Sequence, residues 1–328
     1  MSGDVLDEQV GRDLADWFSA HGLSGRVTCR QAQLDLAHRD ERIFSLEGDL
    51  GLPSVPFAEE LPEQYRQIGI AEANLMGVAA GMAMRGIKPF VNTFATFATM
   101  RACEQMRLDI AYHASNVTVV GYYAGISGGW AGPTHHCIED IAIMRVLPNM
   151  TVLSPADAFE AYQATVAAAR HEGPVYLRVG RSDTPRVHEH AQPFEIGRAM
   201  TLRDGGDATI VATGGLMVAE ALRAAQLLEP HGLACRVLNV HTLKPLDVEA
   251  LTAAARETSA VVTLEDHNVV GGLGSAVASL LAERHPVTVD RFGISDRYCV
   301  RCDDYEEMLS LHGIAAQDVC DGVLRRLR

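Results

Sequence analysis

The stretch GIAEANLMGVAAGMAMRGIKPFVNTF, residues 69–94, joins a helix pattern to a strand pattern and contains one acid, Glu72. Small and apolar residues dominate residues 73–84, which is typical of a helix that lies inside a protein. A carboxylate in the first turn of a helix interacts favourably with the helix dipole. An unpaired buried charge, however, costs roughly several kcal/mol and persists mainly where function needs it. Glu72 is therefore either a helix-start acid or a buried carboxylate kept for catalysis.

The alternation of helix and strand continues on both sides of this stretch. We expect helix within residues 5–40, a long helix over about 96–113, and a glycine-rich loop that opens into a helix over 128–148. Further helix is expected over 158–173, and strands are expected over 42–51, 88–94, 116–125, 150–157 and 174–181. Regular alternation of this kind predicts an α/β domain with a mostly parallel sheet.

Residues 182–196, SDTPRVHEHAQPFEI, break the pattern with two prolines and mixed charge, so we expect an interdomain segment there. A second α/β unit follows. Its strands are expected over 208–215, 234–246, 260–267 and 287–293, and its helices over 216–230, 247–257 and 272–284. Two domains suit a chain of 328 residues, since a typical domain has about 150.

Composition narrows the possible partners. The formal charge is −14, which argues against a general nucleic-acid or lipid-surface partner because phosphate binding needs basic surface. The acidic, amphipathic start differs from a signal or transit peptide, and no apolar run approaches the ~20 residues needed to cross a bilayer. Seven scattered cysteines are typical of reduced thiols. We expect a cytoplasmic protein, and no metal site, because the single pair Cys299 and Cys302 is weak evidence for zinc.

Several familiar motifs are missing or incomplete. Gly271, Gly272 and Gly274 follow a predicted strand but lack the full dinucleotide fingerprint, so close strand-to-helix packing is their expected role. The sequence contains neither a Walker phosphate loop nor a nucleophile elbow, so a hydrolase interpretation has no support. His135 and His136 lie in GPTHH, on a glycine-rich loop that suits a cleft better than a metal site.

Five motifs together resemble the C-terminal half of transketolase: RQIGIAEANLMGVAAGMAMRG, KPFVNTFATF, GPTHHCIEDIAIMRVLPNMTVLSPAD, PVYLRVGR and LEDHNVVGGLGSAV. The chain resembles still more closely the smaller subunit of split, two-gene transketolases, over nearly its whole length. The resemblance implies a doubly wound α/β domain that binds the pyrimidine of thiamine diphosphate (residues 1–185). A linker (186–196) and a smaller α/β transketolase C-terminal domain (197–328) are expected to follow.

The resemblance also implies a role for Glu72. The matching glutamate hydrogen-bonds a ring nitrogen of the cofactor's aminopyrimidine and so promotes removal of the thiazolium proton. Phe94 and Phe97 match aromatic residues that pack against the pyrimidine, and Met100 stands where transketolases often have a tyrosine. His135 matches an active-site histidine that contacts substrate oxygens and helps to move protons.

Substrate residues are implied in the same way. Arg30 and Arg181 match two arginines that hold a sugar phosphate, for which guanidinium geometry is well suited; a surface salt bridge is the alternative for both. Tyr123 occupies the place of a phosphate-contacting histidine. Ala131, preceded by Trp130, stands where transketolases commonly have an aspartate that bonds the donor's hydroxyl. Asp49 matches an acid near the subunit contact, with no assigned role.

A partner subunit is the last implication. The family holds the cofactor's diphosphate through a metal, here expected to be Mg²⁺, bound by a G-D-G…N motif that this chain lacks. An N-terminal-half subunit must then supply that site, in an expected α₂β₂ assembly acting on a small sugar or 2-oxo substrate. The expected reaction is transfer of a two-carbon unit. The alternatives are the β subunit of a 2-oxoacid-decarboxylating thiamine diphosphate enzyme and a non-catalytic subunit that has kept the fold.

Overall fold

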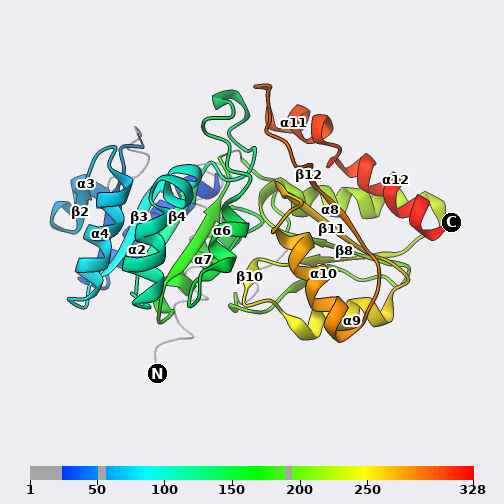
Figure 1. Ribbon diagram of the computed structural model, residues 1–328, viewed down its shortest axis with the longest axis horizontal. Coiled ribbons are helices and arrows are strands. Elements are labelled where there is room, and N and C mark those ends of the chain that lie inside the picture. Colours follow the sequence, from blue (N-terminus) through cyan, green and yellow to red (C-terminus); the bar gives the residue numbers. More distant parts are fainter. Residues whose placement is uncertain (1–23, 51–56, 182, 189–193) are drawn as a thin grey trace.

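Two sheets lie side by side, each flanked by helices, in the computed structural model (Figure 1). The structure describes residues 24–50, 57–181, 183–188 and 194–328. The helix expected within residues 5–40 is therefore described only from residue 24 onward, and residue 182 and residues 189–193 of the expected linker lie outside the described residues. None of the helices in these ranges is long and apolar enough to cross a membrane.

The first unit contains most of one sheet. Its strands are β1 (Ile43–Glu47), β2 (Tyr65–Gln67), β3 (Lys88–Phe94), β4 (Thr118–Tyr122), β5 (Thr151–Leu153) and β6 (Val175–Val179). Its helices are α2 (Gly25–Ala37), α3 (Phe57–Glu60), α4 (Glu72–Ala83), α5 (Cys103–Gln105), α6 (Asp140–Val146) and α7 (Ala158–Arg170), with short 3₁₀ turns at Pro62–Gln64 (η1) and Gly129–Ala131 (η4).

The second unit begins after the linker region. Its strands are β7 (Met200–Arg203), β8 (Ala208–Ala212), β9 (Cys235–Asn239), β10 (Thr242–Lys244), β11 (Val261–Asn268) and β12 (Val289–Ile294). Its helices are α8 (Gly215–Leu228), α9 (Val248–Glu257), α10 (Leu273–Arg284), α11 (Tyr305–His312) and α12 (Ala316–Leu327), with a 3₁₀ turn at Glu229–His231 (η5).

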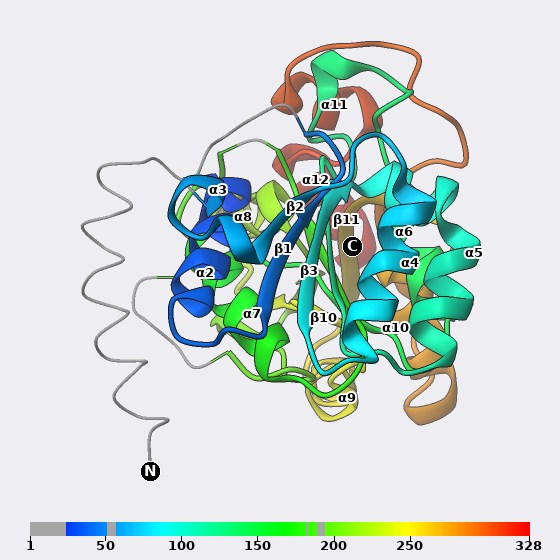
Figure 2. The ribbon, with the colours of Figure 1, turned by 90° about the vertical axis from the view of Figure 1, so that its left-hand side faces the viewer.

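Strand order confirms the predicted α/β class. The first sheet runs β10-β5-β6-β4-β3-β1-β2 and is parallel except for β10, which pairs antiparallel with β5. The second runs β12-β11-β8-β9-β7, with β7 as its antiparallel edge. Figure 2 shows α2 and α7 on one face of the first sheet and α4, α5 and α6 on the other. Each sheet therefore buries both faces, as parallel sheets do.

Each expected strand is present, but β10 lies in an unexpected place. The sequence predicts one strand over 234–246. In the structure this strand ends at Asn239 (β9), and Thr242–Lys244 (β10) pairs with β5 in the first sheet. The largest apolar core cluster likewise draws on both units, combining Leu46 and Val152 with Leu243 and Leu273. The two units therefore share a core, which fixes one against the other.

The helix expected over 96–113 is present but irregular. Only Cys103–Gln105 (α5) is regular, and π-helical turns flank it at Phe97–Arg101 (η2) and Met106–Tyr112 (η3). The backbone N–H of Ala102 accordingly donates to the carbonyl of Phe97, five residues back, at 3.2 Å. Such widened turns are rare and occur most often at functional sites.

Candidate active site

Glu72 is the first residue of α4 and is only 1% exposed. Its Oε2 accepts a hydrogen bond from the Arg101 guanidinium at 2.8 Å, while Oε1 accepts none from any residue that the structure describes. The helix itself is built from small residues, with Gly77 and Gly81 inside it. The acid is thus buried and held by one cation, with one oxygen left available.

An aromatic cluster adjoins Arg101, the partner of this acid, because the Arg101 guanidinium carbon lies 4.2 Å from the Phe97 ring centroid. Phe94 closes β3 and meets Phe97, Tyr123 and His135 edge to face, with ring centroids 5.7, 4.7 and 5.4 Å away. Phe97 also lies 5.4 Å from the His135 ring. The structure therefore brings together four of the residues that the sequence motifs selected, from β3, η2 and two loops.

Tyr123 follows β4 directly and has a φ of +61°, an uncommon value for a residue other than glycine. Its hydroxyl accepts from Arg181 Nε at 3.0 Å, and the guanidinium carbons of Arg181 and Arg26 lie 5.6 and 5.9 Å from its ring centroid. Arg181 also lies 5.1 Å from the Trp130 ring. Tyr123 and Arg181 follow the carboxyl ends of the adjacent parallel strands β4 and β6, the usual place for a ligand in such sheets, and Arg26 joins them from the start of α2.

The two arginines beside Tyr123 carry uncompensated charge. Neither Arg26 nor Arg181 pairs with a carboxylate in the part of the chain that the structure describes. Burial, with the neighbouring charges of Arg30 and Arg181, holds the pKa of Arg26 below its ordinary value. An anion bound between Arg26 and Arg181 would relieve this repulsion, so the geometry suits a terminal phosphate or sulfonate.

Arg30, by contrast, is engaged within the protein. It is 8% exposed, donates to the Glu47 carboxylate, and lies over the buried Tyr122 ring at 5.8 Å. Tyr65 also donates to Glu47. The guanidinium next to Tyr123 is that of Arg26, one helical turn earlier on α2. The sequence motifs did not select Arg26, because only the tertiary contacts of α2 show that Arg26 meets Tyr123 whereas Arg30 meets Tyr122.

The loop at 129–136 carries the remaining candidates. Trp130 is 60% exposed, Ala131 is half-buried in the turn η4, and the Thr134 hydroxyl contacts His135 Nδ1 at 3.0 Å. His136 is buried against the Gly129 carbonyl, and burial lowers its pKa. The two histidines thus separate, since His135 faces the aromatic cluster whereas His136 supports the loop.

Two further candidates are more exposed than the residues of this cluster. Met100 follows Phe97 on η2, but its side chain is 48% exposed. Asp49 is exposed, with a φ of +56°, and its N–H donates to the Gln67 side chain. In the second unit Cys299 lies against His312, and Cys302 is exposed.

The second unit is joined to the candidate site through buried ion pairs. Arg178 on β6 is 4% exposed and pairs with Asp140 at 3.0 Å and with Asp266 at 2.8 Å, so it joins the two units. Asp266 also accepts from Tyr305 and packs directly on Gly125, which has a φ of +63° and leaves no room for a Cβ. This buried charge network therefore fixes the turn that presents Tyr123.

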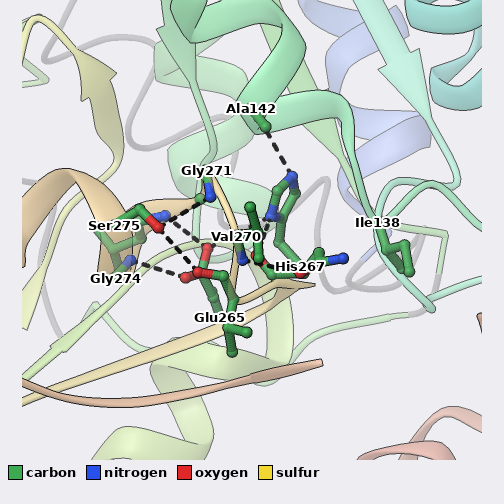
Figure 3. Close-up of polar contacts among 12 residues, drawn as sticks. Ile138, Ala142, Glu265, His267, Val270, Gly271, Gly274 and Ser275 are labelled. Carbon is green, nitrogen blue, oxygen red and sulfur yellow. Dashed lines mark hydrogen bonds and ion pairs between the residues drawn. The ribbon is translucent and has the colours of Figure 1, made fainter. Parts of the chain in front are cut away.

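Figure 3 shows the glycine-rich segment after β11. Glu265, 1% exposed, accepts from the N–H groups of Leu273 and Gly274 at 2.6 and 2.8 Å, and a side chain at Gly272 would collide with this carboxylate. His267 accepts from the Ala142 N–H at 3.3 Å, across the boundary between the units. The helix start that would hold a phosphate in a dinucleotide fold is thus occupied by the protein's own acid. The glycines serve close packing, as expected.

Sequence patterns match the two units separately. The pattern of the family described as "Transketolase, pyrimidine binding domain" matches residues 22–186, and that of "Transketolase, C-terminal domain" matches residues 197–319.

Individual relatives are similar over most of the chain. The "6-deoxy-6-sulfo-D-fructose transketolase subunit SqwH" of Clostridium sp. (strain MSTE9) is 45% identical over 80% of this chain and 82% of its own length. An apulose-4-phosphate transketolase subunit of Phocaeicola vulgatus is 37% identical over 91% of this chain and 97% of its own. A solved structure described as "Split gene transketolase, inactive beta4 tetramer" superposes with a TM-score of 0.86 at 44% identity, covering 93% of this chain and 99% of that one.

Proposed function

We propose that this chain, which belongs to the transketolase family, is one subunit of a split, thiamine diphosphate-dependent enzyme that moves a two-carbon ketol unit from a ketose or 2-oxo donor to an acceptor. The observation that carries the proposal is the buried Glu72 carboxylate, which keeps one oxygen available and whose partner Arg101 stacks on Phe97 of the aromatic cluster. A helix-start acid has no need of that burial.

The residues present fit an aminopyrimidine. Glu72 offers a hydrogen-bond acceptor from a dry position, where charge-assisted bonds are strong, and the flat faces of Phe94 and Phe97 suit a heteroaromatic ring. When bound, thiamine diphosphate supplies the electron sink for an acyl carbanion. Glu72 is proposed to hold the ring-nitrogen proton. His135 is proposed to contact the substrate oxygens and to carry protons to and from them.

A partner chain is proposed to complete the site. Figure 2 shows α4, α5 and α6 on one face of the first sheet. Several large apolar residues in or next to α4, η3 and α6 are exposed: Ile70, Met84, Leu108, Tyr112 and Val146. Exposed apolar residues of this size suit a protein–protein interface. We propose that the occupant is an N-terminal-half transketolase subunit that brings the diphosphate and Mg²⁺ ligands, in an α₂β₂ assembly. Two relatives are themselves subunits, and the similar β4 tetramer is described as inactive.

The donor is proposed to end in a phosphate or a sulfonate. Arg26 and Arg181 flank Tyr123 with no carboxylate partner among the described residues, and they replace Arg30 and Arg181 as the proposed anion-binding pair. The relatives are named for a sulfo-fructose and a phosphorylated sugar, which differ in their anionic end. Trp130 and Tyr123 would line the approach, and Met100 is proposed as a looser wall beside the pyrimidine.

Ala131 favours a second candidate reaction. A 2-oxoacid-decarboxylating enzyme would use the same cofactor and the same Glu72, and it would have no need of the aspartate that Ala131 replaces. Its donor would lack the hydroxyl beside the carbonyl. Formation of a lipoyl-linked product would distinguish it from ketol transfer.

The test is Glu72→Gln in the assembled complex with the partner chain, thiamine diphosphate and Mg²⁺. Glutamine keeps the size of the side chain but removes its charge. General acid–base catalysis accelerates a step by roughly 10²–10⁴-fold, so we expect the rate of thiazolium proton exchange to fall by that factor. NMR measures this rate. The matched control, Glu172→Gln, changes an exposed glutamate after α7 and should exchange at the wild-type rate. An unchanged rate in the assembled E72Q complex would return Glu72 to a helix-start role.

A further inference from the structure

Arg101 makes the one hydrogen bond that the described residues provide to the Glu72 side chain. Its guanidinium donates to Oε2 at 2.8 Å, and the two side chains differ sharply in exposure, 2% for the acid and 48% for the arginine. The charge of the acid is thus balanced from the open side of the site. Without Arg101, a carboxylate that is almost fully buried would lose this partner, and its two oxygens would have no fixed orientation.

Phe97 holds the guanidinium in place. The guanidinium carbon of Arg101 lies 4.2 Å from the Phe97 ring centroid, within the range of a strong cation–π contact. Both residues belong to the π-helical turn η2, in which the N–H of Ala102 bonds the Phe97 carbonyl. Phe97 and Arg101 are four residues apart in this turn, so their side chains meet on one face of it.

We infer that Arg101 is a positioning residue for Glu72. It holds Oε2 and so turns Oε1 toward the aminopyrimidine, where Oε1 would accept a hydrogen bond from the ring N–H. This inference rests on the proposed function, because it assigns Oε1 to the cofactor. It goes beyond that function because it names Arg101 as the residue that orients Glu72. The sequence motifs did not select Arg101.

A merely structural ion pair is the competing explanation. In that case, removal of Arg101 would lower stability but would leave proton exchange at the assembled site unchanged. Arg101→Met keeps an unbranched chain against Phe97 without charge, and Arg101→Lys keeps the charge without the planar fork. Arg256→Gln, at an exposed arginine of α9 in the second unit, is the matched control.

The experiment uses the complex with the partner chain and Mg²⁺. It measures the affinity for thiamine diphosphate by calorimetry and thiazolium proton exchange by NMR. We expect R101M to weaken affinity and to slow exchange by about 10- to 100-fold, R101K to recover part of both, and R256Q to match wild type. In the double variant E72Q/R101M, exchange should be no slower than in E72Q alone, because the arginine acts through the acid.

Two results would overturn the inference: wild-type exchange and affinity in R101M, or effects of E72Q and R101M that multiply in the double variant. If R101M does not assemble, Arg101→Gln decides, and wild-type exchange in that neutral variant contradicts the inference. Failure of the proposed function has a different signature. In that case the wild-type complex itself would not bind thiamine diphosphate or accelerate exchange.

Discussion

Tyr123 and Ala131 are the two residues from which we infer the donor preference of the proposed site. Tyr123 adopts a φ of +61° and is packed by Phe94, Arg26 and Arg181, so its hydroxyl is fixed as an acceptor for one of the arginines. Ala131 offers no polar group at the position where a donor hydroxyl is commonly bound. On the proposed function, the anionic end of a donor would be bound more strongly here than the hydroxyl beside its carbonyl.

Ala131→Asp should restore that recognition. A charge-assisted hydrogen bond is worth about 1.5–3 kcal/mol, so we expect the preference for hydroxylated ketose phosphates over donors without this hydroxyl to rise by roughly 10- to 150-fold. Steady-state rates on a panel of donors give kcat/KM for each donor, and the ratio of these values between donors with and without the hydroxyl measures the preference. Wild-type rates on hydroxylated ketose phosphates as high as those of ordinary transketolases would show that Ala131 carries no specificity.

Arg181→Gln and Arg26→Gln should weaken binding of the anionic end. Each removes one charged donor, so we expect KM for a phosphorylated or sulfonated ketose to rise by about 10-fold or more, with little change for a neutral ketose of the same length. Steady-state kinetics on the paired donors give the comparison, with Arg256→Gln as the control. An equal loss on neutral donors would argue that these arginines support the fold instead of the substrate.

The segment from β11 to α10 illustrates how a glycine-rich turn can be used for packing. Glu265 caps the start of α10 from inside, and burial raises its pKa to about 7, against an ordinary value of 4.5. The folded protein therefore binds this proton more tightly than the unfolded chain does. The resulting stabilisation is complete below about pH 4.5 and is lost as pH rises through about 7.

Glu265→Gln should flatten this dependence. Between pH 5 and pH 8 we expect the wild-type free energy of unfolding to fall by on the order of 1–3 kcal/mol from Glu265 alone, and the variant to lack that part of the fall. Some dependence should remain, because burial also raises the pKa of Glu160 to about 7. Denaturant titrations over this pH range measure the change. The control Glu283→Gln changes an exposed acid of α10 and should keep the wild-type dependence of unfolding free energy on pH. If E265Q also kept the wild-type dependence, this role for Glu265 would be ruled out.

Regular elements were predictable, whereas irregular ones were not. The buried strands β3, β4 and β6 and the helices α7 and α8 were expected because their apolar patterns are long and bounded by glycine or proline. The π-helical turns of 97–112 were not, since an extra residue per turn leaves the composition of a helix unchanged. The position of β10 in the first sheet was not predictable either, because it depends on tertiary pairing with β5.

The candidate site was predictable in part, through motifs that the sequence shares with transketolases. Those motifs selected Glu72, Phe94, Phe97, Tyr123 and His135, which the structure brings together. They did not select Arg26 or Arg101, and they assigned no role to Asp266. The reason is physical, because these roles depend on tertiary contacts, several of them between segments distant in sequence.

Residues of the second unit pack against the part of the first unit that contains the candidate site. The second unit contributes Asp266 to the buried pair with Arg178 and packs on the loop at 129–132, while the first unit presents the candidate site at the carboxyl ends of its strands. Exposed apolar residues in or next to α4, η3 and α6 are proposed to be covered by the partner. On this proposal the chain provides half of an active site that becomes complete on assembly.

One measurement tests this claim most directly. Thiamine diphosphate and Mg²⁺ are titrated calorimetrically into the purified chain, alone and together with a chain that bears the G-D-G…N motif, and ketol transfer is followed in the same samples. We predict weak cofactor binding and no turnover for the chain alone, with both restored when the partner is added. Tight cofactor binding and full turnover by this chain in isolation would contradict the half-site proposal.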